Sequence, residues 1–448
     1  MKAADMTMEQ IEQLIAEHKV STVIVAATDP AGVVRGKRLT VPYFRKAVEG
    51  GVNFSSYILG TTTMDEVLPG LFDTGIPDVR GHIDLGSFRL APWEDGAAIV
   101  LMDWHTEEGE PHPLCPRSAL KRQVERAGDM GYAVRASLEL EFYLLPIPIH
   151  EVRQGRWSDL PLPARDIHCY SVLEGHFSEP IIGRLRACFP DEIEACLPEW
   201  GQGQFEVNLY RSDALKMADT AVMMKLAAKQ IAAEAGATAT FIAKLREDMS
   251  GSSGHIHLSL RDARSGESVF YDPSRPLRLS RIFEQFVAGN LEVFREAALF
   301  YAPNVNSYKR MQAGSFAGTT RCWGVDNRTA GFRAINESAG KARLEIRIGG
   351  ADLNPYLAIA VGLGAGLRGI AKGLTPPPAA TGNNYEQGVE TVPATLAEAA
   401  AATAAGTAIR EILPPELVAN ALKIAQFEIG VFQATVTDLE RRRYMETV

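Results

Sequence analysis

Hydrophobic and polar residues alternate in short segments through the first hundred residues of the chain. The opening segment, MKAADMTMEQIEQLIAEHKV, predicts an amphipathic helix with Ile11, Leu14 and Ile15 along one stripe. Apolar runs such as STVIVAATD and AAIVLMD follow, separated by the turn sequences DPAG and PWEDG. The pattern predicts a small strand-rich domain from residue 21 to about 110, which with the helix occupies residues 1–112.

The pattern changes after residue 112. From Ser118 the apolar residues follow a helical period, and strands then alternate with long helices, which is typical of an α+β domain over residues 113–448. The run NPYLAIAVGLGAGLRGIAKGL is interrupted by Arg368 and is too short to cross a bilayer, which needs about 20 apolar residues. It predicts a buried helix, and its GxGxxG spacing follows no strand, which disfavours a dinucleotide site.

Four segments of the larger domain have one apolar and one polar face. In SLELEF, Glu139 and Glu141 are two residues apart and so point to the same side of a strand. GQFEVNL, GHIHLSL and RLEIR alternate in the same way. Their polar faces carry Gln204, Glu206, Asn208, His255, His257, Ser259, Arg343, Glu345 and Arg347. Two like charges on one strand face need a cation opposite them, unless the segment is an edge strand with solvated glutamates.

The residue types on these polar faces indicate a metal-dependent reaction. Carboxylates and imidazole without thiolates suit Mg²⁺ or Mn²⁺. Arginines bind the charge on a transferring phosphoryl group or a substrate carboxylate. Together the four segments predict phosphoryl transfer, although each residue taken singly is also typical of a solvated strand or a structural histidine.

Composition and charge narrow the class of protein. The chain has 448 residues, 46% of them hydrophobic, which excludes a disordered protein. A net charge of -9 with interspersed signs argues against nucleic-acid binding and favours a small-molecule enzyme. The five cysteines form no CxxC pair, and the start has no signal-peptide pattern, so we expect a cytoplasmic protein without disulfides and without a membrane anchor.

The same segments resemble, in order and over nearly the whole chain, the active-site blocks of the type I glutamine synthetase family. The matching blocks are LELEFYLL, PEWGQGQFEVNL, ATFIAKLREDMSGSSGHIHLSL, NSYKRM, NRTAGFR and RLEIRIGGADLNPYLAIA. DPAGVVRGK and VTDLERRRY also match. The resemblance implies an N-terminal β-grasp domain, a catalytic domain whose antiparallel strands form a funnel, and a homododecamer of two stacked hexamers with active sites between neighbouring subunits.

The resemblance also implies roles for individual residues. One divalent ion is expected at Glu141, Glu199 and Glu206, and a second at Glu139, His255 and Glu345. Glu199 comes from the resemblance alone. Arg310 and Arg347 would bind the α-carboxylate of glutamate, while Arg328, Arg333 and Arg343 would face the phosphates of ATP and His257 and Ser259 would lie towards the nucleotide. Arg310, Arg328 and Arg333 are the expected catalytic residues.

In this family the γ-carboxylate of glutamate attacks the γ-phosphate of ATP, and a nitrogen nucleophile then displaces phosphate from γ-glutamyl phosphate. Two positions depart from members that use ammonium. Ser55 in VNFSSY and Phe316 in MQAGSFAGTT stand where those members carry an Asp and a Glu that bind ammonium. Loss of both acids and gain of an aromatic ring favour a carbon-bearing amine.

The chain therefore resembles the γ-glutamyl-amine synthetase branch, which ligates glutamate to polyamines or to monoamines such as ethanolamine. The amine-binding residues are expected to include Ser55 and Phe316. Two alternatives are an ordinary glutamine synthetase and a member without activity that serves as a structural or regulatory ring. A member without activity is expected to have lost metal ligands, whereas all six expected ligands are present.

Overall fold

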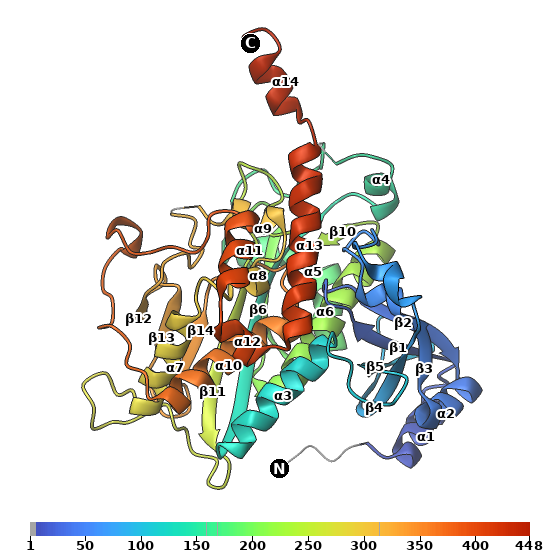
Figure 1. Ribbon diagram of the computed structural model, residues 1–448. Coiled ribbons are helices and arrows are strands. Elements are labelled where there is room, and N and C mark those ends of the chain that lie inside the picture. Colours follow the sequence, from blue (N-terminus) through green and yellow to red (C-terminus); the bar gives the residue numbers. More distant parts are fainter. Residues whose placement is uncertain (1–5, 158, 168, 313) are drawn as a thin grey trace.

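An N-terminal sheet and a larger sheet divide the chain, for which a computed structural model describes residues 6–157, 159–167, 169–312 and 314–448 (Figure 1). The described part of the N-terminal sheet has the order β2-β1-β5-β4-β3. Its two central strands, β1 and β5, are parallel, and the other pairs are antiparallel. The strands are β1 (Thr22–Thr28), β2 (Val34–Thr40), β3 (Val52–Ser55), β4 (Asp78–Leu90) and β5 (Ala97–His105).

Two helices, α1 (Met8–Glu17) and α2 (Val41–Gly50), belong to this N-terminal part. Helix α1 begins at a capping box, in which the Thr7 hydroxyl accepts from the backbone N–H of Gln10. Ile11 and Ile15 are buried, so the helix and its predicted apolar stripe are confirmed. Short 3₁₀ turns follow at Ser56–Leu59 and Leu71–Thr74.

The larger sheet carries the four strands with mixed faces. Its main path, among the described residues, is β12-β13-β14-β11-β6-β8-β7, and β9 and β10 pair with β6. The predicted strands are β14, β11, β6 and β8, which are consecutive neighbours and all antiparallel. The strands are β6 (Tyr132–Leu145), β7 (Ile193–Pro198), β8 (Gln204–Leu209), β9 (Ser212–Asp213), β10 (Thr238–Thr240), β11 (Gly254–Asp262), β12 (Trp323–Val325), β13 (Phe332–Ile335) and β14 (Arg343–Ile346).

Helices cover the apolar face of this sheet, so that its polar face is left for a site. The apolar residues of β6, β8, β11 and β14 form one core with α3, α6 and α10. The helices of this part are α3 (Pro116–Asp129), α4 (Ile149–Arg153), α5 (Val172–Cys188), α6 (Ala214–Glu234), α7 (Arg281–Glu292), α8 (Ala298–Tyr301), α9 (Val305–Arg310), α10 (Pro355–Lys372), α11 (Leu396–Ala405), α12 (Ala408–Ile412), α13 (Pro415–Ala434) and α14 (Asp438–Tyr444), with a 3₁₀ turn at Asn384–Glu386.

Helix α10 is the apolar run that the sequence predicted to be a buried helix. Its glycines permit close packing on α7, because a Cβ added at Gly369 would overlap the carbonyl oxygen of Gln285 and one added at Gly366 would overlap the Phe286 ring. The prediction of a buried helix is thus confirmed. In the part of the chain that the structure describes, no helix is long and apolar enough to span a bilayer.

A buried ion cluster joins the two sheets. Arg117 of α3 is 3% exposed and contacts Asp84 of β4 at 2.8 Å, Asp103 of β5 at 3.1 Å and Asp219 of α6 at 2.8 Å. Removal of Arg117 would leave buried carboxylates without their shared cation, which costs about 3–5 kcal/mol. The α+β class is confirmed, and the boundary at residues 112 and 113 stays a prediction.

Candidate functional site

Two adjoining cavities lie on the polar face of the larger sheet. The larger, of about 910 Å³, is lined by Glu247, which is exposed, and by five further glutamates that gather on the sheet face, namely Glu139, Glu141, Glu199, Glu206 and Glu345. The smaller, of about 610 Å³, shares Glu139 and Asn208 with it. The glutamates form two groups on the two sides of β6, which we describe in turn.

The acidic triad consists of Glu141, Glu199 and Glu206, which offer three carboxylate oxygens within 4.8 Å of one another. Glu141 on β6 pairs directly with Glu206 on β8, so their side chains leave the sheet on one face. Glu199 follows the end of β7 and reaches the same space. Glu141 accepts hydrogen bonds from the Ser253 backbone N–H at 2.6 Å and from Gln204 Nε2 at 3.1 Å.

Burial and like charge disfavour ionisation of the acidic triad. Burial, with the charges of Glu139 and Glu141, raises the pKa of Glu206 to about 9. Burial also raises the pKa of Glu141 to about 7, against the hydrogen bond from Ser253, and raises the pKa of Glu199. A divalent cation would reverse this, because it favours the charged form of every carboxylate around it.

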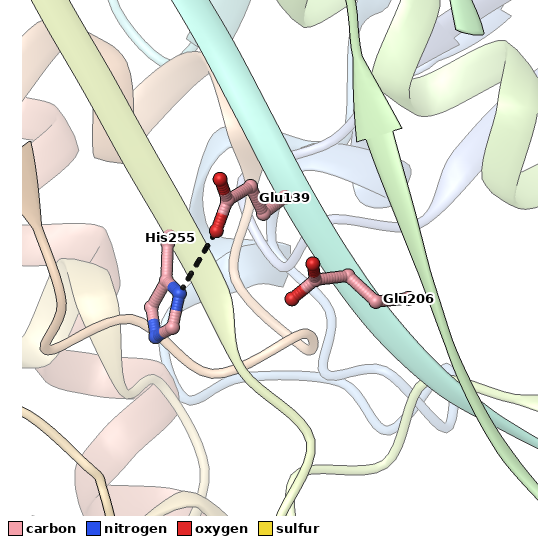
Figure 2. Close-up of side chains that lie close together, drawn as sticks. All are labelled: Glu139, Glu206 and His255. Carbon is pink, nitrogen blue, oxygen red and sulfur yellow. Dashed lines mark hydrogen bonds and ion pairs between the residues drawn. The ribbon is translucent and has the colours of Figure 1, made fainter. Parts of the chain in front are cut away.

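The imidazole cluster consists of Glu139, His255, His257 and Glu345. His255 faces Glu139 across the β6–β11 pair, and its Nδ1 lies 3.4 Å from Glu139 Oε2 and 3.6 Å from Glu345 Oε1 (Figure 2). His257 Nε2 lies 3.0 Å from Glu139 Oε1, and His257 Nδ1 accepts from Arg343 Nε at 3.1 Å. The nitrogen of His255 that could share a metal ion with Glu139 and Glu345 is therefore Nδ1, which lies close to both carboxylates.

Figure 2 shows that Glu139, Glu206 and His255 point into one space, where they form a further group that could hold a cation. Glu139 thus borders both the acidic triad and the imidazole cluster. Burial acts to raise its pKa, but His257 and His255 lower it well below its usual range. Two cations bound side by side would therefore share Glu139 as a neighbour.

Two arginines compensate Glu345, whose side chain is 1% exposed. Arg333 Nη1 lies 2.8 Å from its Oε2, and Arg347 Nη1 bonds its Oε1. Burial would raise the pKa of Glu345, but His257, Arg347 and His255 lower it to about 2. The carboxylates of Glu139 and Glu345 thus favour the ionised form without any added cation, in contrast to those of the acidic triad.

Comparison with known proteins places this site in a family. The profile described as "Glutamine synthetase, catalytic domain" matches residues 113–444. The chain belongs to the glutamine synthetase family. The predicted family and fold are therefore confirmed, and with them the expectation of the ATP and divalent metal use typical of glutamine synthetases.

Relatives within the glutamine synthetase family include two that are named for amine ligation. The chain is 38% identical to a glutamate–isopropylamine ligase of Pseudomonas sp, over 98% of each chain. It is 36% identical to a gamma-glutamylethanolamide synthetase of Streptomyces coelicolor, over 98% of this chain and 96% of the relative. A solved structure titled "Apo GmaS without ligand" superposes with a TM-score of 0.87 at 26% identity and covers 98% of this chain and all of that one.

Most residues expected from the glutamine synthetase blocks line the cavities. Beside the glutamates and His255, the larger cavity is lined by Phe316, Arg328, Arg333 and Arg347. His257, Ser259 and Arg343 line the smaller cavity. The predicted roles of these residues stay predictions, because the geometry brings them together without a ligand.

Two expected residues lie outside both cavities. Arg310 is 2% exposed, and its Nη2 donates to the carbonyl oxygens of Ile348 and, at 2.8 Å, Gly349. It lies behind the cavity wall in this conformation. Ser55 ends β3 at the edge of the N-terminal sheet. Ser55 therefore contributes to neither cavity of its own chain.

Several residues of the larger cavity were not among the site residues expected from the sequence. Cys169 and Tyr170 precede α5, and the Cys169 thiol donates to Glu199 Oε2 at 3.8 Å. Trp200 follows Glu199 in a loop, where no periodicity applies. Asn208 lies on the polar face of β8, and its Nδ2 donates to Glu206 Oε1 at 2.8 Å. Strand alternation had placed Asn208 on that face but could not assign it a contact.

Proposed function

We propose that this chain is an ATP-dependent ligase that joins the γ-carboxylate of L-glutamate to a carbon-bearing amine. The observation that carries the proposal is Phe316, which lines the same cavity as the glutamates and is 56% exposed there. An aromatic ring cannot take a proton from ammonium, but it can cover the carbon of an amine. The full-length similarity to ligases named for isopropylamine and for an ethanolamide supports it.

Two divalent cations, Mg²⁺ or Mn²⁺, fit the two groups of ligands. Glu141, Glu199 and Glu206 would hold one ion, and Glu139, His255 and Glu345 the other. The raised pKa values of Glu141 and Glu206, and the approach of His255 Nδ1 to both Glu139 and Glu345, support this assignment. Bound there, the cations would supply charge compensation for the phosphates of ATP.

The chain's own cations would act on the two substrates. ATP would occupy the smaller cavity near His257, Ser259 and Arg343, with Arg333 and Arg328 toward its γ-phosphate. Glutamate would lie in the larger cavity, with its α-carboxylate near Arg347. Arg310 would join it only after its bonds to the Ile348 and Gly349 carbonyls are released. The pair of arginines would thereby orient the γ-carboxylate.

The reaction has two steps. A γ-carboxylate oxygen attacks the γ-phosphorus of ATP, the bond to the β-phosphate oxygen breaks, and γ-glutamyl phosphate and ADP form. The neutral amine then attacks the acyl carbon, phosphate leaves and the amine loses a proton. We infer that this proton passes to water or to the leaving phosphate, because the carboxylates of the acidic triad would be bound to a cation.

The assembly is part of the proposal. We infer a dodecamer in which residues 1–112 of one subunit complete the site of the next, so that Ser55 reaches a neighbouring cavity. Helix α14 supports an assembly because it extends away from the remainder of the chain (Figure 1), and Leu439 and Tyr444 on it are more than half exposed. Such apolar side chains are covered when subunits associate. The cytoplasm stays the expected location.

Phosphate release with ATP, Mg²⁺ and glutamate, compared across ammonium, ethanolamine, alkylamines and polyamines, tests the proposal. We expect γ-glutamyl amides from a carbon-bearing amine and a poor rate with ammonium, since the site does not offset its desolvation. The paired change Ser55→Asp with Phe316→Glu should raise the ammonium rate and lower the amine rate. Equal efficiency of the unmodified enzyme with ammonium would make it an ordinary glutamine synthetase, and inactivity with every nucleophile would favour a structural ring.

A further inference from the structure

Two exposed aromatic rings meet in the larger cavity. Trp200, from the loop between β7 and β8, and Phe316, from the segment before β12, have ring centroids 6.3 Å apart at an interplanar angle of 59°. Both residues line the cavity, and they are 53% and 56% exposed. Large apolar rings left open to water at the same place mark a site for an apolar group.

The main chain around Phe316 fixes the position of its ring. Phe316 has a φ of 57°, a left-handed conformation that costs a residue with a side chain about 1 kcal/mol or more. Its carbonyl oxygen accepts from Arg347 Nη2 at 3.3 Å, and the next carbonyl, of Ala317, accepts from the Tyr385 hydroxyl at 3.0 Å. The ring is thus held toward the cavity before any ligand arrives.

The second ring is tied to the acidic triad. The backbone N–H of Trp200 donates to Glu199 Oε2 at 3.0 Å, so the indole lies directly beside a carboxylate of the triad. A primary amine has a nitrogen that seeks carboxylates and a carbon chain that seeks apolar cover. Carboxylate and aromatic pair together match these two ends.

We propose that Trp200 and Phe316 form an aromatic pair that binds the carbon substituent of a short primary monoamine, a specificity that rests on the proposed ligase function. The two rings themselves carry no charge, and the acidic residues of the same cavity lining, among them Glu247 and Asp248, are separate from them. A second ammonium, as in a diamine, would be desolvated against the rings without an ion pair. The site therefore prefers an alkylamine to a diamine of the same length.

The test compares butylamine with butane-1,4-diamine, which differ only in the second amino group, in the full-length enzyme and in Trp200→Ala. The substitution keeps the backbone N–H that bonds Glu199. We expect the unmodified enzyme to have the higher kcat/KM for butylamine, and Trp200→Ala to lower that value about tenfold or more, mainly through KM. The KM values for glutamate and ATP should stay within about twofold, and Trp200→Phe should recover most of the loss.

Trp157→Ala is the matched control, because Trp157 is 64% exposed but lines neither cavity. Equal losses for methylamine and butylamine in Trp200→Ala would overturn the inference and assign Trp200 a structural role. Preference for the diamine, lost in Glu247→Gln at the cavity rim, would also overturn it. If the unmodified enzyme forms no γ-glutamyl amide at all, the ligase function itself fails, and the two failures are distinguishable.

Discussion

The acidic triad and the imidazole cluster share one face of one sheet, yet the chain treats their charges in opposite ways. The cluster contains Glu345, which forms ion pairs with Arg333 and Arg347 and whose pKa His257, Arg347 and His255 lower to about 2 against the effect of burial. The triad contains Glu206, whose pKa is raised to about 9 by burial and by two neighbouring glutamates. The two sites lie on either side of β6.

The difference shows that the chain supplies its own compensating charges at the imidazole cluster, whereas the acidic triad needs a bound cation for compensation. The imidazole cluster is positioned by its own ion pairs and is ready before a cation binds. The acidic triad keeps protons until a cation replaces them, because buried carboxylates with like-charged neighbours favour the neutral form. Cation binding at the triad should therefore be coupled to proton release, whereas binding at the cluster should not.

The largest effect is expected on turnover, because the reaction needs both the acidic triad and the imidazole cluster. Glu141→Ala and His255→Ala should each lower kcat/KM by about a thousandfold or more, since each removes an expected ligand on the polar face and none of the core. Circular dichroism and sedimentation should match those of the unmodified enzyme. Glu108→Ala, at an exposed carboxylate, is the control. Near-normal activity in either variant would contradict the two-metal assignment.

Substitutions in the imidazole cluster and in the acidic triad should change the free energy of unfolding in opposite directions. Glu345→Gln leaves Arg333 and Arg347 without their buried partner, so the free energy of unfolding should fall by about 3 kcal/mol. Glu206 is buried at pH 8 without a metal only by taking up a proton, which costs free energy. Glu206→Gln keeps nearly the same shape and needs no proton, so in EDTA at pH 8 it should raise the free energy of unfolding by about 1 kcal/mol or more. Urea unfolding measures both, and equal losses in the two variants would show that the triad is not under charge strain.

Strand alternation predicted the strand residues that take part in this contrast, but not the contrast itself. It predicted the four strands and one shared face for Glu139 and Glu141. The pairing of β6 with β8 then places Glu206 beside Glu141, and the pairing of β6 with β11 places His255 beside Glu139. A period of two specifies the face of a strand but not its neighbours, so the assembly of the two groups had to come from the fold or from the family resemblance.

The sequence pattern did not predict the cavity residues that lie in loops, nor the direction of Arg310. Trp200 and Cys169 lie where no repeat constrains direction, and Arg310, in a helix, is turned to the Ile348 and Gly349 carbonyls instead of the cavity. Residue type alone cannot distinguish an arginine that binds substrate from one that satisfies buried carbonyl groups. Only the positions of its hydrogen-bond acceptors make that distinction.

The pH dependence of metal binding sharpens the comparison. The pKa values of Glu141 and Glu206, about 7 and about 9, lie above the usual 4.5. Between pH 4.5 and pH 9 the metal-free folded protein therefore binds more protons than the unfolded chain. The triad's contribution to stability is therefore lost as pH rises from 4.5 toward 9. Glu345 acts oppositely, because its contribution is lost as pH falls from 4.5 toward 2.

Added Mg²⁺ should accordingly raise the Tm more at pH 8.5 than at pH 6.5, by about 5 °C or more. Differential scanning calorimetry with and without Mg²⁺ at each pH measures the difference. In Glu206→Gln the pH dependence of the Mg²⁺ effect should be reduced, since the most strongly shifted carboxyl is absent. The same Mg²⁺ effect at both pH values would mean that the triad does not exchange protons for a cation.

The smallest effect is expected at Asn208, which the comparison singles out because it borders both cavities and supports only the triad. Its Nδ2 donates to Glu206 Oε1 at 2.8 Å and so orients one expected ligand without being a ligand itself. Asn208→Ala should raise the Mg²⁺ concentration required for half-maximal rate by about tenfold, as is typical for partners of metal ligands, with kcat at saturating Mg²⁺ nearly unchanged. Asn208→Asp should be worse than Asn208→Ala in the absence of Mg²⁺, because a fourth carboxylate adds to the like charge, and its stability in EDTA should fall at pH 8. Steady-state rates across a Mg²⁺ titration measure the first effect, and urea unfolding measures the second. An equal loss of kcat at every Mg²⁺ concentration would instead place Asn208 among the residues that contact substrate. The acidic triad would then depend on Glu141 and Glu199 for its geometry.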